Sequence, residues 1–133
     1  MKAISVILIA GFFALSSTSA QADTKKVQIP ANKTELIDVI AAIDGDSCHS
    51  LLSNPKIRTS PKNGRLNIQI VKIKAPKGPC RGKTVQVLVV QYQPKRGFRG
   101  KDEGSITYSA PPRQYRERQM AVSRTRKYLI TVK

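Results

Sequence analysis

The chain has few of the side chains on which most enzymes depend. Its 133 residues include a single histidine, His49, and only eight acidic residues. That histidine stands beside Cys48, which we expect to be oxidised. For this reason neither a Ser-His-Asp nor a Cys-His arrangement can be assembled from the sequence. The sequence also has no Gly-rich phosphate-binding loop ahead of a helix. We therefore predict that the protein is not an enzyme and that it carries no cofactor.

The few acidic residues are placed as structural rather than catalytic groups. Asp44 and Asp46 flank a glycine and predict a solvated turn. Asp102 and Glu103 follow closely on basic residues, so we expect local ion pairs there.

Cysteine is also scarce, and its even count favours a disulfide. The two cysteines are Cys48 and Cys80. A metal site that used them with His49 would want short cysteine spacings and a fourth ligand, which the sequence lacks. In an oxidising compartment the pair should form one disulfide, worth about 3 to 4 kcal/mol in the chain-entropy model, and we predict no metal site.

Long hydrophobic runs are absent after the first 20 residues. Those residues have a charged start, an apolar run from Ile4 to Leu15 and a tail of small residues, which is the pattern of a secretory signal peptide. Cleavage after Ala20 fits best, and cleavage after Ala22 is the alternative. The apolar run is shorter than the roughly 20 residues that span a bilayer. We expect an exported protein, periplasmic or secreted, with no transmembrane segment after cleavage.

Negative charge is outnumbered threefold, and this excess indicates the kind of partner. The chain has 24 Lys and Arg residues and a formal net charge of +16. Such a charge attracts polyanions. In an exported protein these are envelope glycolipid phosphates, acidic polysaccharides, acidic protein surfaces or extracellular nucleic acid, whereas cytoplasmic nucleic acid is not an expected partner.

No long helical pattern is visible, and alternating apolar residues predict six or seven strands. One strand, 83–93, is apolar on both faces and should lie in the centre of a sheet. Residues 21–26 are expected to be a loose tail. The clear strands are expected at 27–30, 56–60, 65–74, 83–93, 105–109 and 124–133.

The stretch 34–43 fits two structures. Alternate residues from Ile37 to Ile43 are apolar, as in a strand, but Leu36, Ile40 and Ile43 also form a helical stripe. The β-branched content favours the strand.

A strong turn signal at 61–64 predicts a hairpin between strands 56–60 and 65–74. Within the second strand the apolar parity switches at Ile70 and Val71. A β-bulge or a bend there would explain the switch.

The most patterned stretch runs from Tyr92 to Tyr108. Gly97 and Gly100 bracket Phe98, which predicts a tight corner pinned by a buried ring. The patterned positions are Tyr92, Pro94, Gly97, Phe98, Gly100, Asp102 and Tyr108.

This order, Y-x-P-x-x-G-F-x-G-x-D followed by an aromatic strand, resembles immunoglobulin-like and cadherin-like modules of bacterial exported proteins, whose function is generally uncharacterised. The resemblance implies that residues 21–133 form a single all-β domain, an immunoglobulin-like Greek-key β-sandwich of about seven strands with one disulfide. It also implies that Asp102 accepts hydrogen bonds from the backbone of the corner and does not bind calcium. The chain departs from the pattern at Glu103 and Gly104, which we interpret as a small insertion at the corner.

Basic residues cluster around and after this corner and are the candidate binding residues, because the planar guanidinium group of arginine suits phosphate and carboxylate. Solvation of an exposed surface explains such a cluster equally well. The candidates are Lys95, Arg96, Arg99, Lys101, Arg113, Arg116, Arg118, Arg124 and Arg126.

Two functions follow as hypotheses. The first is a non-enzymatic, exported binding module that engages an anionic envelope or extracellular partner through this arginine-rich surface. The alternative is a structural or accessory subunit that docks to another exported protein by β-strand pairing.

Overall fold

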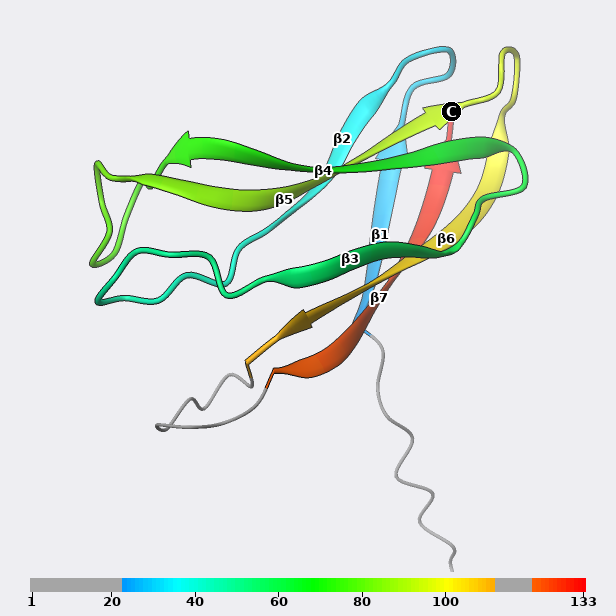
Figure 1. Cartoon of the computed structure of the whole chain (residues 1–133). Coiled ribbons are helices and arrows are strands. Elements are labelled where there is room, and N and C mark those ends of the chain that lie inside the picture. The colour runs from blue at the N-terminus through cyan, green and yellow to red at the C-terminus, as the bar shows by residue number, and fades with distance from the viewer. Residues whose placement is uncertain (1–22, 112–120) are drawn as a thin grey trace, which may run out of the picture.

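The computed structural model describes residues 23–111 and 121–133, which fold into two β-sheets packed face to face (Figure 1). The predicted signal peptide, 1–20, lies outside the described residues. The strands are β1 (Asp23–Ile29), β2 (Glu35–Ile40), β3 (Ser53–Thr59), β4 (Gly64–Lys74), β5 (Thr84–Pro94), β6 (Gly100–Ala110) and β7 (Val122–Val132).

The strand order is that of an immunoglobulin-like Greek-key sandwich. One sheet has the order β1-β7-β6-β3 and the other has the order β2-β5-β4. The strand β1 runs parallel to β7, and every other pair is antiparallel. A disulfide joins Cys48 to Cys80. The predictions of an all-β sandwich, seven strands and one disulfide are therefore confirmed.

The strand β5 is the centre of the three-stranded sheet, as its sequence predicts. Leu88, Val90 and Tyr92 are fully buried in the main core between the sheets. The alternate residues Val85 and Val87 are also buried, in a second cluster that contains the disulfide. A strand that serves two clusters has no polar face, and this explains its continuous apolar run.

Within the stretch 34–43, residues Glu35–Ile40 form a strand, β2, and the helical alternative is wrong. A register shift between Leu36 and Asp38 interrupts its pairing with β5. As a result Ile37 and Asp38 are both buried, although they are neighbours, while Leu36 is exposed. The irregularity blurs the strand period, and for this reason the sequence also fits a helix.

The predicted hairpin at 61–64 is wrong. The turn exists, but β3 pairs with β6 and β4 pairs with β5, so the chain passes from one sheet to the other there (Figure 1). Local turn residues determine that the chain reverses. They do not determine which sheet the next strand joins.

The predicted bulge near Ile70 is also wrong. The residues of β4 pair with those of β5 without interruption from Gly64 to Lys74. The face that points inward changes in both strands at the same place, between the Ile70–Leu88 pair and the Val71–Val87 pair. One half of the β4–β5 hairpin packs on the main core and the other half packs on the cluster that contains the disulfide.

Two element boundaries also differ from the sequence predictions. Residues 23–26, expected in a loose tail, belong to β1 and pair with β7. Glu103 and Gly104 do not form an insertion at the corner, because they lie inside β6, whose register with β7 is unbroken.

The corner between β5 and β6 has the predicted backbone. Gly97 has φ of 79° and Gly100 has φ of 131°, both in the region that favours glycine. Phe98 packs against the core but is only half-buried, so the prediction of a buried ring is wrong in degree. Tyr92 and Tyr108 are buried in the main core.

Candidate functional site

Three loops and the last residue of the chain meet at one end of the sandwich. The amide of Gly97 donates to Asn32 Oδ1 at 2.8 Å, which ties the β5–β6 corner to the β1–β2 loop. The amide of Lys95 donates to the carbonyl of Asn63 at 2.9 Å, which ties the corner to the β3–β4 turn. The carbonyl of Lys133 accepts from Ala31 in the β1–β2 loop. Hydrogen bonds therefore connect segments from four parts of the chain.

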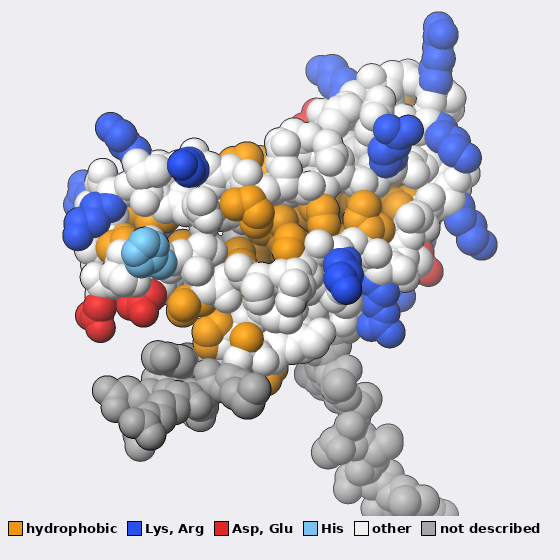
Figure 2. Space-filling view, in the orientation of Figure 1, with side chains coloured by type: hydrophobic (Ala, Val, Ile, Leu, Met, Phe, Trp, Pro, Cys, Tyr) orange, Lys and Arg blue, Asp and Glu red, His pale blue; other side chains and the backbone are white. Residues whose placement is uncertain are grey.

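This end, which we call the basic end, presents eight exposed cationic side chains. Figure 2 shows Lys and Arg side chains gathered where the β3–β4 and β5–β6 connections lie. None of them forms an ion pair with a described acidic residue. The residues of the basic end are Lys33, Lys62, Arg65, Lys95, Arg96, Arg99, Lys101 and Lys133.

The structure brings together only part of the predicted binding surface. Four of the predicted cations, Lys95, Arg96, Arg99 and Lys101, are exposed at the basic end. Arg113, Arg116 and Arg118 lie outside the described residues.

Arg126 is not available as a free binding residue, and this prediction is wrong. Its side chain is only 22% exposed and forms ion pairs with Asp38 at 2.9 Å and with Asp23 at 3.6 Å. Burial alone would lower the pKa of Arg126, but the hydrogen bond and the charge of Asp38 raise it. Arg124 is also engaged, because its guanidinium donates to the carbonyl of Pro111 at 2.6 Å. Both residues line one pocket beside the end of β2, but their guanidinium groups are already engaged by structural partners.

The sequence reasoning missed the other half of the basic end. Lys33, Lys62 and Arg65 are about 30 residues or more before the predicted cations in sequence, and only the topology places them beside the corner; Lys133 follows the last predicted cation, Arg126, by seven residues. Their positions next to turns could have indicated that they lie at an end of the sandwich. Which turns share an end, however, depends on the order of the strands, which the sequence does not give.

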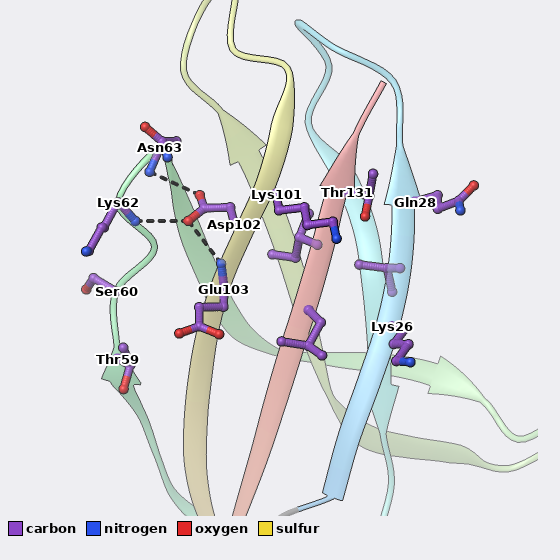
Figure 3. A pocket seen from close by; sticks show the side chains of 13 residues that line it. Lys26, Gln28, Thr59, Ser60, Lys62, Asn63, Lys101, Asp102, Glu103 and Thr131 are labelled. Atoms are coloured by element: carbon purple, nitrogen blue, oxygen red, sulfur yellow. Dashed lines mark hydrogen bonds between the residues drawn. The ribbon is translucent and has the colours of Figure 1, made fainter.

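A groove of about 790 Å³ opens on the outer face of the four-stranded sheet and continues from the basic end (Figure 3). Lys101 on β6 lies opposite Thr131 on β7, which lies opposite Gln28 on β1. Lys26 and Lys62 line the groove on its two sides. The groove thus offers ammonium groups together with hydroxyl and amide groups that can donate hydrogen bonds.

Glu103 is the exposed carboxylate of the groove, and it pairs with Lys127 on the neighbouring strand at 3.4 Å. Asp102 also borders the groove, but its side chain is buried. Neither Asp102 nor Glu103 forms an ion pair with Arg99 or Lys101, so the prediction of local ion pairs is wrong. Since β-strand neighbours point to opposite faces, Asp102 turns inward while Lys101 and Glu103 turn outward. The exposed lining keeps an excess of positive charge.

Asp102 organises the turn that carries Lys62. Its carboxylate accepts hydrogen bonds from the amides of Lys62 and Asn63, both at 3.1 Å (Figure 3). It also accepts one from the hydroxyl of Tyr92 at 2.7 Å. The role is structural, as the motif implies. Its backbone partners are in the β3–β4 turn and at Glu103, not in the Gly-rich corner.

The opposite end of the sandwich holds the disulfide loops and the only histidine. His49 is exposed there. Asp44 accepts hydrogen bonds from the amides of Asp46 and Ser47, which lower the pKa of Asp44 and identify it as a turn residue. Among the residues that the structure describes, no three His, Cys, Asp or Glu side chains are grouped so that they could hold a metal ion.

Comparison with known proteins gives no match, since no family profile, curated protein or solved structure is significantly similar to the chain. Within 23–111 and 121–133, no helix is long and apolar enough to cross a membrane.

Proposed function

We propose that the protein is an exported, non-enzymatic immunoglobulin-like module that binds an anionic polymer through the basic end and the adjoining groove. The observation that carries the proposal is the gathering of eight exposed cations from separate loops and strand ends onto one end, without acidic partners in the described part of the chain. Unpaired positive charge concentrated in this way attracts negative charge from solution.

The arrangement fits a polymer better than a single small anion. The groove extends across four strands, from Lys26 on β1 to the residues beside β3, and adjacent strands lie about 4.8 Å apart. Its cations are therefore spread over roughly 15 Å instead of converging on one point. Repeated phosphate, sulfate or carboxylate groups along a chain would meet several of these cations at once. An acidic envelope polysaccharide is the partner that we favour.

Export is supported by the residue pattern of the first 20 residues and by the disulfide. Disulfides persist in oxidising compartments and are rare in the cytoplasm. An exported protein with a positively charged end meets the anionic polymers of the envelope directly.

Neutralising three cations of the corner tests this function. The variant Lys95→Gln, Arg96→Gln, Arg99→Gln should bind heparin, used as the probe polymer, more weakly than the wild type. The slope of log affinity against log salt concentration should become shallower by about one for each lost contact. Titration of labelled heparin at several salt concentrations measures both quantities.

The matched control removes three cations from the opposite end, with Lys77→Gln, Arg81→Gln and Lys83→Gln. All three residues are exposed in the loop that contains the second cysteine. Net charge falls equally in the two variants, so the control should bind nearly as well as the wild type. Equal losses in both variants would show that overall charge, and not the basic end, attracts the polymer.

A further inference from the structure

Three of the four sheet edges are protected against pairing with another strand. The edge strand β2 has only six residues and a register shift. The edge strand β3 contains Pro55 and two register shifts. The edge strand β1 has seven residues, is followed by Pro30, and connects to the other sheet through an ion pair between Lys25 and Asp38 at 3.3 Å. Short strands, prolines and bulges are the usual protection of exposed edges.

The fourth edge, β4, has none of these three features, and its protection is limited to the charged side chains of Arg65, Lys72 and Lys74. It is 11 residues long, contains no proline, and pairs with β5 in an unbroken register. Among the described strands, none pairs with its other side. Alternate residues of such a strand direct their N–H and C=O groups away from the sheet, where a further strand could bond them.

Hydrophobic side chains are exposed beside this edge. Ile70 and Ile73 on β4 are 44% and 38% exposed, and Ile57 on the neighbouring edge strand β3 is 40% exposed. Figure 2 shows a band of hydrophobic side chains between the layer of β4 and the layer of β3. In the described residues no ion pair or side-chain hydrogen bond joins β3 to β4, in contrast to the side closed by Lys25 and Asp38. A strand added along β4 would cover part of this band.

The charges of the two strands define the partner. Neither β3 nor β4 contains an acidic residue, and each carries exposed cations, such as Lys56 on β3 and Lys72 and Lys74 on β4. A second copy of the chain would bring a further cationic strand to an edge that is already cationic and would supply no opposite charge. An acidic strand would place opposite charges there instead.

We propose that the β4 edge binds an extended segment of another exported protein in which apolar and acidic residues alternate, and that this segment adds a strand to the β2-β5-β4 sheet. The apolar side chains would cover the hydrophobic band, and the acidic ones would meet Lys72 and Lys74. Backbone hydrogen bonds supply the affinity in this mode, and alternate side chains supply the specificity. The site is separate from the groove and does not depend on polymer binding.

A short synthetic peptide in which valine and glutamate alternate is a suitable probe. Its comparison is the same peptide with N-methyl groups on two adjacent central residues, which block pairing along both of its edges without changing charge. The unmodified peptide should bind at least about tenfold more tightly, because only it can complete the strand pairing. Fluorescence anisotropy measures both affinities, and hydrogen–deuterium exchange should show protection within Gly64–Lys74.

Protein variants locate the site. Reversal of charge with Lys72→Glu and Lys74→Glu should weaken binding of the unmodified peptide at least about tenfold, because acidic side chains would then face each other. The matched reversal Lys77→Glu and Arg81→Glu, in the loop that follows β4, should weaken it less than about threefold. Equal affinity of the two peptides, equal effects of the two reversals, protection on a different edge, or no binding at all would overturn the proposal.

Discussion

Two buried tyrosine–aspartate pairs connect the sheets in opposite directions. Tyr92 on β5 donates to Asp102 on β6 at 2.7 Å, and Tyr128 on β7 donates to Asp38 on β2 at 2.7 Å. Each sheet therefore contributes one tyrosine and one carboxylate. Burial, followed by the hydrogen bond to the carboxylate, raises the pKa of both tyrosines, so both hydroxyls stay protonated and donate. Buried polar groups that are fully paired in this way fix how two layers sit together.

The Asp38 pair makes the stability dependent on pH in the acid range. Burial alone would raise the pKa of Asp38, but hydrogen bonds from Arg126 and Tyr128 and the charges of Arg126 and Lys25 outweigh it, and the pKa is lowered. A lowered pKa means that the unfolded chain takes up the proton first as the pH falls. The contribution of Asp38 is therefore complete above pH about 4 and is lost as the pH falls through the folded-state pKa.

We expect Asp38→Asn to reduce the free energy of unfolding by about 3 kcal/mol near neutral pH, because Arg126 loses its buried partner. The difference between the variant and the wild type should shrink once the pH falls below about 4. Urea unfolding at a series of pH values measures this difference. Asp46→Asn, which removes the same charge from an exposed loop, is the control for net charge. A difference that stays constant down to the acid limit would contradict the assigned role.

The sequence allowed one of these two carboxylates to be predicted as a structural residue. Asp102 stands in a recognisable motif, which implies its structural use. Asp38 stands within a stretch of apolar residues and has no local partner, since Tyr128 and Arg126 come from the last strand. An interaction across 90 residues of chain cannot be inferred from local pattern, and the same is true of the position of Lys33 and Lys62 at the basic end.

At the scale of elements, the chain is closely packed where it crosses from β3 to β4. The backbone of Gly64 lies so close to Tyr92 that a Cβ atom added there would be 2.5 Å from the ring and the hydroxyl. The turn before it is held by Asp102, which also accepts from Tyr92. Because glycine has no Cβ atom, the backbone at position 64 can lie directly against the Tyr92 ring while Tyr92 keeps its hydrogen bond to Asp102.

We expect Gly64→Ala to reduce the free energy of unfolding by about 1 to 3 kcal/mol, because the fully buried ring of Tyr92 cannot move aside without strain. Gly45→Ala is the matched control, since a Cβ atom there would meet its nearest neighbour, Pro79, at an ordinary 3.6 Å. Chemical denaturation of both variants measures the difference. Equal stability of the two variants would show that the close approach in the structure is not a real constraint.

Strands were easier to predict than their partners. The apolar faces of β5 and β7 are long and regular, so their positions followed from side-chain alternation alone. Pairing depends on which apolar surfaces meet across the core, and a strong turn at 61–64 gave the wrong answer because the chain there changes sheets. The start of β6 was predicted too late in the sequence. Its first five residues, 100–104, are polar on the outward face, and their inward face carries glycine and Asp102 in place of apolar side chains.

The whole molecule has two ends of different character. The basic end gathers exposed cations on segments that hydrogen bonds connect. The other end holds the disulfide loops, where Figure 2 shows acidic side chains and the histidine together with further Lys and Arg side chains. The free β4 edge runs between these ends. An anionic polymer bound at the basic end would therefore leave the side of the sandwich open to a partner strand.

The most direct test of polymer binding is to map where the polymer touches the protein. Amide chemical shifts of isotope-labelled protein, titrated with a short heparin fragment at moderate salt, would report this. We predict that the largest shifts fall at residues 32–33, 62–65, 95–101 and 131–133, and that they reverse when salt is added, since screening weakens exposed charge contacts. Shifts spread evenly over all cations, or centred on the disulfide end, would contradict the proposal that the basic end is the binding site.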